Sequence, residues 1–387
     1  MPDRIGVGVI GTGFMGRCHA LAWRSVGALF DDVPLPELIA VCDVDAGAAA
    51  RMAERFGFVR ASVDWRELVA DPAIAVVSIT LPNALHKEVA VAALRAGKHV
   101  WCEKPMALTL ADAEIMASAA AEAPGLAALG YNYLRNPAVE HAARLIESGA
   151  IGKVAQFRGV VDEDYSADPA LPWSWRYRRA AAGLGVLADL MCHLISVAQR
   201  LAGPIERVCG DLDTVHLARP LSDQPGERRP VENEDVASAL VRFADGASGT
   251  LASSRIAWGR KNRLAWEVHG TRGTLAFDQE RMNELLLFEA DGPAATRGFR
   301  TILTGPLHPP YARFCPAPGH GLGFNDLKVI EAAQLLQAIA GRAAPPTSFA
   351  EGLAIERTVH AIAASVASGG WIRTEAALPR AEAPMTS

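Results

Sequence analysis

The first third of the chain alternates short apolar runs, rich in β-branched residues, with longer stretches in which apolar positions recur at helical spacing. The short runs predict strands at Ile5–Ile10, Pro36–Cys42, Ala75–Leu81, Lys98–Trp101 and Leu126–Gly130. The longer stretches predict helices at Met15–Ser25, Ala46–Phe56, Ala84–Ala96 and Leu110–Glu122. Strands and helices that alternate in this way are typical of a parallel sheet covered by helices.

Two local signals mark the ends of these predicted helices. Thr109 and Asp112 stand three residues apart at the start of the last helix, which is the spacing of a capping box. Gly97 follows the preceding helix in the position where glycine commonly ends one.

The pattern changes between about residue 150 and residue 290, where longer runs alternate apolar and polar positions. One such run reads ASALVRFADGASGTLASS, in which Asp245 and Gly246 predict a hairpin turn. This alternation predicts an antiparallel sheet with one face open to solvent or to a partner. Helices are predicted at about Asn325–Ala340 and Ala350–Ala367, after a connection rich in glycine and proline.

Composition bounds the class of protein. At 387 residues and 50% hydrophobic content, two domains are the expected organisation. The formal net charge of −5, with no basic face, argues against a nucleic-acid partner. The N-terminus has no signal-peptide pattern, and no segment approaches the roughly 18 apolar residues of a membrane helix. We therefore expect a cytoplasmic protein without a membrane partner.

The six cysteines are scattered singly along the chain. They form no CxxC pair and no Cys/His cluster of zinc spacing, so no metal site is predicted. Single cysteines in a long chain are typical of small buried apolar residues in a reducing compartment.

The segment IGVGVIGTGFMGRCHA carries a dinucleotide-binding fingerprint. Gly11, Gly13 and Gly16 follow an apolar strand and open a helical pattern. In that context the first glycine permits a tight turn, the second lets a pyrophosphate approach the backbone, and the third lets helix and strand pack closely. Phe14 and Met15, at the start of the helix, are expected beside the cofactor. The alternative is a plain strand-to-helix turn.

The fingerprint also requires an acidic residue at the end of the second strand, to bind the adenosine ribose. LIAVCDVD supplies Asp43, 27 positions after Gly16 rather than the usual ~20, and the loop FDDVPLP accounts for the excess. Val44 follows, so a 2′-phosphate would meet a carboxylate with no cation beside it. NAD is therefore favoured over NADP. Asp43 could in addition cap the next helix.

Polar residues follow two further predicted strands, where ligands of doubly wound sheets bind. SITLPNALH places Pro82, Asn83 and His86 at one strand end, and HVWCEKP places Glu103, Lys104 and Pro105 at the next. We expect Pro82, Asn83 and His86 to contact the cofactor, together with Glu103 and Lys104. From position alone, Lys104 is either a solvent-facing strand end or an amine directed at the nicotinamide.

Taken together, these residues resemble the Gfo/Idh/MocA family of glucose-fructose oxidoreductases and inositol dehydrogenases. The resemblance runs from Ile5 to about Arg373 and rests on the segments LPNALHKEVAVAALRAGKHVWCEKPMALT, GYNYLRNPAV, SGAIGKVAQFRG and GLGVLADLMCHLISVAQRLAG. It implies an α/β fold, in which an N-terminal Rossmann parallel sheet is followed by an α/β domain with an open, mostly antiparallel sheet. We place an NAD-binding domain at 1–131, a substrate-binding and oligomerisation domain at 132–375 and a tail at 376–387.

The resemblance also implies roles for individual residues. Lys104 matches the family's active-site lysine, and Asp189 and His193 match its substrate-side pair. The cleft-lining segment GYNYLRNP makes Asn132 and Arg135 candidate substrate contacts. The resemblance further suggests a cis bond between Lys104 and Pro105, a form seen in only about 5–6% of X-Pro bonds.

These groups suit the oxidation of a secondary alcohol. Asp189 and His193 are four residues apart, hence on one helical face, although such a pair alone is more often a structural hydrogen bond. His193 can accept a hydroxyl proton near neutral pH, and Asp189 can orient it or bind a neighbouring hydroxyl. Lys104 can stabilise charge on the same oxygen. Whether Lys104 or His193 is the formal base stays open.

Narrower features indicate a subgroup. Ser196 stands where inositol-type members often carry an aspartate. DYSADPALPWSWRYRRA, SSRIAWGRKN and RGFRTILTGPLHP are similar to segments of the bacterial levoglucosan dehydrogenases, which oxidise carbon 3 of an anhydrosugar. Trp173, Trp175 and Arg176 could then contact a pyranose, although tryptophans in such a pattern are more often core residues.

The predicted function is an NAD-dependent dehydrogenase acting on a secondary hydroxyl of a pyranose, anhydrosugar or cyclitol. One alternative is an NAD-dependent glycosidase of the same fold, and another is a catalytically silent sugar or NAD sensor. The exposed face of the second sheet predicts a homo-oligomer, a dimer or a tetramer.

Overall fold

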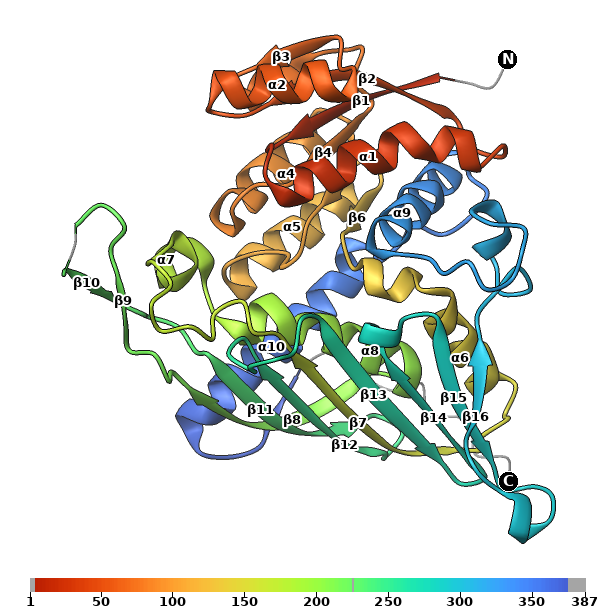
Figure 1. The fold of residues 1–387 in the computed structure, drawn as a ribbon. Coiled ribbons are helices and arrows are strands. Elements are labelled where there is room, and N and C mark those ends of the chain that lie inside the picture. Colours follow the sequence, from red (N-terminus) through yellow and green to blue (C-terminus); the bar gives the residue numbers. More distant parts are fainter. Residues whose placement is uncertain (1–3, 225, 375–387) are drawn as a thin grey trace, which may run out of the picture.

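The N-terminal part of the protein is a six-stranded parallel sheet covered by helices. The computed structural model describes residues 4–224 and 226–374 (Figure 1). The strand order β3-β2-β1-β4-β5-β6 is that of a dinucleotide-binding Rossmann sheet. Its elements are β1 (Arg4–Ile10), α1 (Phe14–Leu29), β2 (Leu35–Cys42), α2 (Ala46–Phe56), β3 (Arg60–Ser62), α3 (Trp65–Ala70), β4 (Val76–Ile79), α4 (His86–Arg95), β5 (His99–Cys102), α5 (Leu110–Glu122) and β6 (Ala127–Leu129).

The C-terminal part is built on a nine-stranded sheet in the order β16-β15-β14-β13-β7-β12-β11-β8-β17. Every neighbouring pair is antiparallel except β7 and β12, which run parallel. Its strands are β7 (Val154–Asp162), β8 (Ile205–Asp213), β11 (Val236–Phe243), β12 (Ser248–Ser254), β13 (Arg263–Gly270), β14 (Gly273–Asp278), β15 (Glu284–Glu289), β16 (Arg300–Leu303) and β17 (Ile372–Arg373). The predicted fold class is confirmed.

The helices of the C-terminal part lie between this sheet and the Rossmann sheet (Figure 1). They are α6 (Pro137–Glu147), α7 (Arg179–Ala182), α8 (Cys192–Ala202), α9 (Phe324–Ile339) and α10 (Phe349–Ser368). α9 packs on α1, and α10 packs on both β8 and α5, so the two parts share one layer of helices. The run Arg179–Ala202 is long and apolar enough to cross a membrane, but 83% of its apolar window is buried, as in the core helix of a globular protein.

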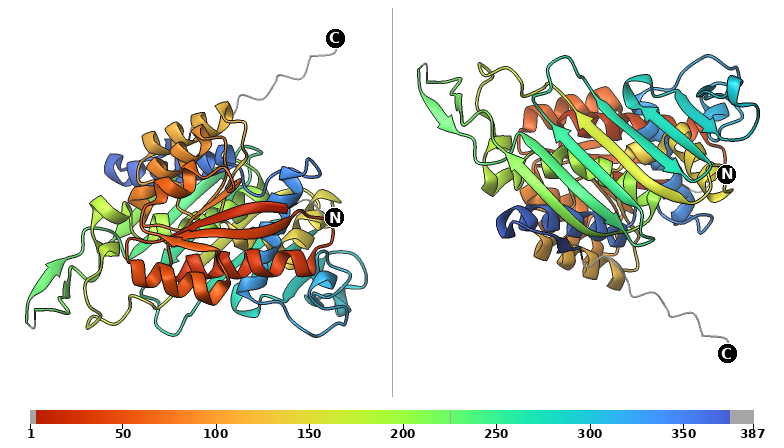
Figure 2. Two further views of the ribbon diagram at one scale, coloured as in Figure 1. Left: turned by 90° about the horizontal axis from the view of Figure 1, so that it is seen from above. Right: turned by 90° about the horizontal axis from the view of Figure 1, so that it is seen from below.

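The outer face of the nine-stranded sheet carries no helix of the described chain (Figure 2). Side chains along β11 alternate between buried and exposed, which is the pattern of a sheet covered on one side. Asp245 and Gly246 form the expected turn between β11 and β12, with Gly246 at φ 89°.

Several elements were not predicted by the periodicity. They are β3, α3, α6 and a short two-stranded arm, β9 (Ala218–Pro220) and β10 (Arg228–Pro230), which projects from the body (Figure 1). The Thr109 hydroxyl accepts a hydrogen bond from the Asp112 N–H, but the Asp112 carboxylate binds Lys87, so only half of the predicted capping box forms. The division at residues 131 and 132 stays a prediction, and the predicted tail at 376–387 lies outside the described residues.

Candidate active site

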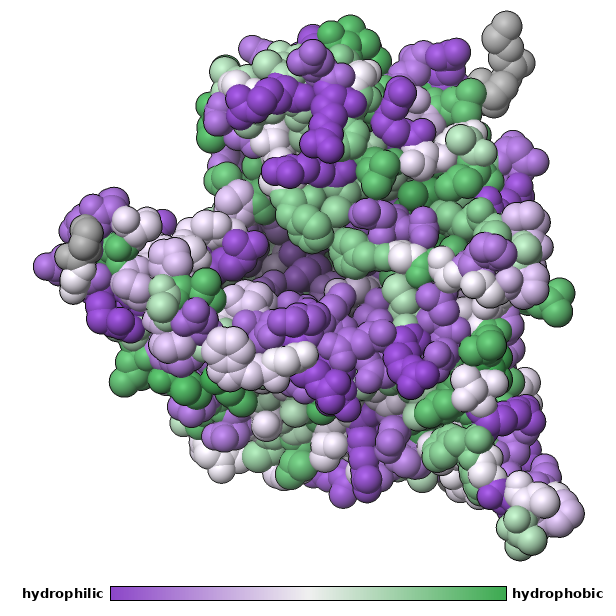
Figure 3. Space-filling model, viewed as in Figure 1, coloured by the Kyte–Doolittle hydropathy of each residue, from purple (hydrophilic) through white to green (hydrophobic). Residues whose placement is uncertain are grey.

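A cleft of about 1360 Å³ lies where the carboxyl ends of the Rossmann strands face the second sheet. Figure 3 shows its opening as a hollow with many hydrophilic residues around it, and apolar residues such as Phe14 and Leu184 also line the cleft. The strand order reverses between β1 and β4, and ligands of doubly wound sheets bind at that point. The cleft is therefore placed where a dinucleotide and a substrate can meet.

The glycine loop between β1 and α1 forms one end of the cleft. Gly11 has φ +103°, and a Cβ there would lie 2.5 Å from the Thr80 carbonyl oxygen. A Cβ at Gly16 would lie 2.1 Å from the Gly11 carbonyl oxygen, whereas a Cβ at Gly13 would meet nothing within 4 Å. Gly11, Gly13, Phe14 and Met15 line the cleft, whereas Gly16 lies outside the lining and packs closely on the Gly11 carbonyl. The open space beside Gly13 and the free N–H groups of α1 fit a pyrophosphate.

Asp43 lies at the end of β2 and faces the glycine loop. Its Oδ2 accepts hydrogen bonds from the Thr12 N–H at 2.9 Å and the Thr12 hydroxyl at 2.6 Å. Burial acts to raise the pKa of Asp43, but the hydrogen bonds from Thr12 and from the main-chain N–H groups of Val44 and Asp45 together outweigh it, and the pKa is lowered. Asp45, not Asp43, caps α2 by accepting from the Ala48 N–H. Asp43 is thus an ionised acceptor at the place where an adenosine ribose would bind.

Of the residues that follow β4, some line the cleft and one is buried in the core. Pro82 and Asn83 line the cleft, and the Asn83 amide donates to the Ala182 carbonyl of α7. His86 lies outside the lining and is fully buried, with its Nδ1 2.9 Å from the Pro105 carbonyl and its Nε2 2.9 Å from the Leu81 carbonyl. The structure therefore does not support a cofactor contact at His86. It ties the β4 and β5 strand ends together.

The strand end after β5 presents Lys104 to the cleft. The Lys104–Pro105 bond is cis, as expected. The Lys104 ammonium donates to Asp189 at two places, to Oδ1 at 2.9 Å and to the main-chain carbonyl at 2.7 Å. Glu103 also reaches the lining, but its carboxylate is held by His19 and Lys328 below the cleft.

Asp189 lies in a π-helical turn, Leu187–Met191, immediately before α8. Its second oxygen, Oδ2, accepts a hydrogen bond from the Tyr165 hydroxyl at 2.9 Å. Both oxygens are thus held by Lys104 and Tyr165, so the expected role in orienting His193 is not what the structure shows. Burial acts to lower the pKa of Lys104, but the Asp189 carboxylate outweighs it and the pKa is raised. Lys104 therefore carries its proton at neutral pH.

His193 lies one turn further along, between two tyrosine rings. The ring centres of Tyr131 and Tyr133 are 5.7 Å and 4.5 Å away. Burial and the charge on Lys104 lower the pKa of His193 well below its usual value, so the imidazole is neutral. Its Nδ1 is buried without a hydrogen-bond partner among the described residues. Ser196 donates to the His193 carbonyl rather than facing a ligand.

The expected substrate contacts are only partly brought together. Asn132, Trp175 and Arg176 line the cleft, and the Arg176 guanidinium lies 4.7 Å from the Trp175 ring centre. Arg135 lies outside the lining, because its guanidinium donates to Gln334 of α9 at 2.6 Å. A substrate contact at Arg135 is therefore not supported.

Sequence reasoning missed Glu163, which follows β7 and lines the cleft. Burial and repulsion from Asp189 raise the pKa of Glu163 from 4.5 to about 7. Tyr133, Tyr165 and Lys261 also line this part of the cleft. The acidic run DED at a strand end was the available signal for Glu163, but such a run usually indicates a solvated surface.

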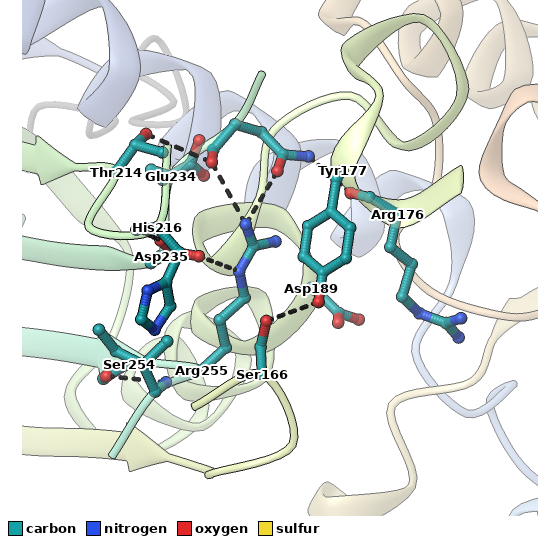
Figure 4. Close-up of polar contacts among 12 residues, drawn as sticks. Ser166, Arg176, Tyr177, Asp189, Thr214, His216, Glu234, Asp235, Ser254 and Arg255 are labelled. Carbon is teal, nitrogen blue, oxygen red and sulfur yellow. Dashed lines mark hydrogen bonds and ion pairs between the residues drawn. The ribbon is translucent and has the colours of Figure 1, made fainter. Parts of the chain in front are cut away.

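A buried polar network supports the wall of the cleft that carries Asp189 (Figure 4). Arg255 donates to Asp235 at 2.8 Å and to the Asn233 side chain at 3.0 Å, with both charged groups buried. Glu234 lies between Asn233 and Asp235 in the sequence. Its carboxylate accepts a hydrogen bond from the Leu187 N–H at 3.1 Å and fixes the start of the π-helical turn. The network thereby holds Asp189 at a set distance from the sheet.

The fold and this cleft define a dinucleotide-binding oxidoreductase. Residues 5–131 match the model of the oxidoreductase family with an NAD-binding Rossmann fold, and residues 139–276 match the GFO/IDH/MocA C-terminal domain. The chain therefore belongs to the Gfo/Idh/MocA family of NAD-binding oxidoreductases.

Three relatives place the chain within the family. Levoglucosan dehydrogenase of Pseudarthrobacter phenanthrenivorans is 39% identical over 96% of this chain and 98% of its own length. A solved structure of levoglucosan dehydrogenase with NADH and levoglucosan has a TM-score of 0.93, with 96% of this chain and 100% of that chain covered. An NAD-binding oxidoreductase from Klebsiella pneumoniae is 43% identical, has a TM-score of 0.92 and covers 96% of this chain and 99% of its own.

Proposed function

We propose that this protein is an NAD-dependent dehydrogenase that oxidises a secondary hydroxyl of a pyranose, anhydrosugar or cyclitol. Carbon 3 of a levoglucosan-like sugar is the favoured position. The observation that carries the proposal is that the cleft bordered by the glycine loop contains both the Lys104 ammonium, held by Asp189, and the buried His193 imidazole, which is neutral because its pKa is lowered. The similarity to levoglucosan dehydrogenase along nearly the whole chain supports the substrate class.

The cofactor is assigned to the glycine loop and the strand ends. The N–H groups of α1 beside Gly13 would hold the pyrophosphate, and Asp43 would accept hydrogen bonds from the ribose. Bound NAD⁺ would supply the hydride acceptor. Asp43 and the uncharged Val44 beside it favour NAD over NADP.

We assign to His193 the role of accepting the hydroxyl proton of the substrate. Lys104 has no free electron pair at neutral pH because Asp189 keeps it protonated, so it serves as a hydrogen-bond donor to the substrate oxygen. His193 is neutral and can accept the hydroxyl proton as the hydride leaves. Asp189 holds the Lys104 ammonium in place and balances its charge.

Several polar and aromatic groups of the cleft suit a substrate with many hydroxyls. Asn132 has a buried amide nitrogen without a partner among the described residues. Trp175 offers an aromatic surface on which a sugar ring can stack, and Arg176 covers part of it. Glu163 offers a carboxyl to a second hydroxyl. These groups are proposed to select a polyhydroxylated ring over a simple alcohol.

A panel of anhydrosugars, pyranoses, cyclitols and aryl glycosides, each with NAD⁺, tests this function. We expect net formation of NADH, followed by its absorbance, with an anhydrosugar as the best substrate. Glycoside hydrolysis without net NADH would instead establish the glycosidase. Binding of sugar and NAD⁺ with neither reaction would establish the sensor.

The outer face of the nine-stranded sheet is proposed to bind a second copy of this chain. Leu240 on this face is 51% exposed and lies opposite Thr250 of β12 and Cys209 of β8. Ala252 and Val160 continue the same face, which also carries the exposed residues Arg158, Arg207 and Arg242. A large sheet face of this kind is a common site of association. We also propose a cytoplasmic location, in keeping with the six cysteines, none of which forms a disulfide.

A further inference from the structure

A row of charges with alternating sign runs from the core to the active site. Glu331, Lys328, Glu103, Lys104 and Asp189 follow one another in contact. The Lys328 ammonium donates to Glu331 Oε2 at 3.0 Å and to Glu103 Oε1. Oε2 of Glu103 accepts from the main-chain N–H of Lys104 at 3.3 Å, and the Lys104 ammonium binds Asp189 at 2.9 Å.

The inner members of this row are shielded from water. Lys328 and Glu331 have no exposed surface, and Glu103 is 4% exposed. Lys328 belongs to α9 and Glu103 follows β5, so the contact joins the C-terminal part to the Rossmann sheet. Burying such an ion pair adds little stability, because the loss of hydration offsets the attraction. A role in fixing geometry is the better explanation for its presence.

Glu103 depends on Lys328 for its charge. His19 also touches Glu103, with 2.8 Å between Nε2 and Oε1, but burial lowers the pKa of His19 to about 4, so this ring is neutral. Burial acts to raise the pKa of Glu103, but the charge on Lys328, together with the hydrogen bonds from His19 and Lys328, outweighs it and lowers the pKa. Without Lys328 we expect the carboxyl to bind a proton more readily and to accept the hydrogen bond from the Lys104 N–H more weakly.

We propose that Lys328 is a positioning residue for Lys104 and acts through Glu103. Lys328 fixes one oxygen of the Glu103 carboxylate, and the other oxygen then holds the Lys104 N–H. The negative charge on Glu103 in addition helps to keep the Lys104 ammonium protonated. The catalytic part of this inference rests on the proposed dehydrogenase function.

Glu103 is faced by titratable groups from every element packed around it. They are Cys18 and His19 of α1, His86 of α4, Cys102 of β5, Lys104 of its own loop, Tyr131 after β6, His193 of α8, and Lys328 and Glu331 of α9. Of the two cations in this set, Lys104 is already paired with Asp189, which leaves Lys328 to balance Glu103.

The experiment compares Lys328→Met with Lys98→Met and with Glu103→Gln. Lys98 is a matched control because it is also buried, but it binds only the Asp71 and Ile74 carbonyls and lies away from the cleft. For Lys328→Met we expect kcat to fall roughly 10- to 100-fold with little change in KM, since a small displacement of a catalytic group has this effect. We also expect a new ionisation in the pH profile of kcat, caused by Glu103. For Lys98→Met we expect unchanged kcat.

The double variant Lys328→Met/Glu103→Gln separates the proposed path from a general loss of packing. If Lys328 acts through Glu103, the double variant is no slower than Glu103→Gln alone. Multiplying effects would overturn the proposal. A Lys328→Met protein that loses thermal stability but keeps the kcat and pH profile of the parent would also overturn it.

A chemical readout keeps this test independent of the substrate. Trace acetylation by acetic anhydride, followed at the peptide that carries Lys104, reports the fraction of free amine. We expect acetylation of Lys104 to speed up about tenfold for each unit by which its pKa falls in Lys328→Met, with no change in Lys98→Met. Unchanged labelling would contradict the positioning role. A parent protein that oxidises no sugar would contradict only the proposed function.

Discussion

The ammonium of Lys104 lies 2.9 Å from Oδ1 of Asp189, an ion pair that joins the end of a Rossmann strand to the helical layer of the second domain. Two consequences follow. The pair keeps Lys104 protonated, so the proton acceptor of the proposed reaction has to be a different group. It also links the two sides of the cleft, and the Tyr165 hydroxyl fixes the other oxygen of the same carboxylate.

Replacing Lys104 by methionine should lower kcat strongly while leaving NAD⁺ binding intact. The side chain keeps its length and loses the charge that stabilises the substrate oxygen, which typically costs roughly 10²- to 10³-fold in kcat. Steady-state rates and the dissociation constant of NAD⁺ check the two parts separately. Full turnover in this variant would exclude the proposed mechanism.

Glu163 predicts a dependence of stability on pH. Its pKa rises from 4.5 to about 7 on folding, so the folded protein holds the proton more tightly than the unfolded chain does. The contribution of protonated Glu163 to the free energy of unfolding is therefore fully present below pH 4.5 and is lost as the pH rises towards and past 7. Glu163→Gln removes this loss. By denaturant unfolding it should be more stable than the parent at pH 8, by at most about 3 kcal/mol, and equal to it near pH 4.

The same variant has a kinetic signature. If Glu163 contacts a substrate hydroxyl, Glu163→Gln should remove an ionisation near neutral pH from the profile of kcat/KM. A profile identical to that of the parent would show that the Glu163 carboxyl has no contact with the substrate.

The sequence could predict those parts of the site that are formed by residues close together along the chain. The glycine loop, Asp43, the Glu103–Pro105 turn and the Asp189–His193 spacing are local patterns, and the side chains of Asp43, Lys104, Asp189 and His193 reach the cleft. His86 and Arg135 stand beside such patterns, yet their side chains turn to Pro105 and Gln334. Strand ends fix the position of a Cα atom and not the direction of a side chain.

Other parts of the site depend on contacts between distant segments. Lys328 lies 225 positions from Glu103, and in the sequence it resembles any lysine of a helix. Glu163 belongs to an acidic run, and its raised pKa arises from burial in the cleft and from repulsion by Asp189. Neither property is visible without the packing that creates it.

The glycine loop allows a prediction with a built-in control. Gly13→Ala adds a methyl group that meets no protein atom, so its thermal stability should stay that of the parent. The methyl group would project into the space assigned to the pyrophosphate and weaken NAD⁺ binding, by roughly tenfold or more for each 1.4 kcal/mol lost. Gly16→Ala should instead destabilise the fold, because its Cβ would lie 2.1 Å from the Gly11 carbonyl oxygen. Weak binding together with reduced stability at Gly13 would contradict this assignment.

Asp43 should decide the choice between NAD and NADP. In Asp43→Ser/Val44→Arg the carboxylate that repels a 2′-phosphate is replaced and a cation is supplied next to it. The ratio of the dissociation constants of NADP⁺ and NAD⁺ should fall by at least about tenfold, which corresponds to ~1.4 kcal/mol. Val44 is 93% exposed, so the single variant Val44→Arg should fold normally and shift the ratio less. No shift in either variant would place the ribose elsewhere.

The outer sheet face should determine the oligomeric state. Leu240→Lys places a charge in the centre of the proposed contact between two copies, where it would be buried without a partner, and such a charge costs several kcal/mol. Light scattering after size-exclusion chromatography should show the parent as a dimer or tetramer and the variant as a smaller species. Val59→Lys is the control, since Val59 is 79% exposed but belongs to the Rossmann part. A Leu240→Lys protein with the mass of the parent would show that the copies meet through another surface, and a monomeric parent would remove the proposed contact altogether.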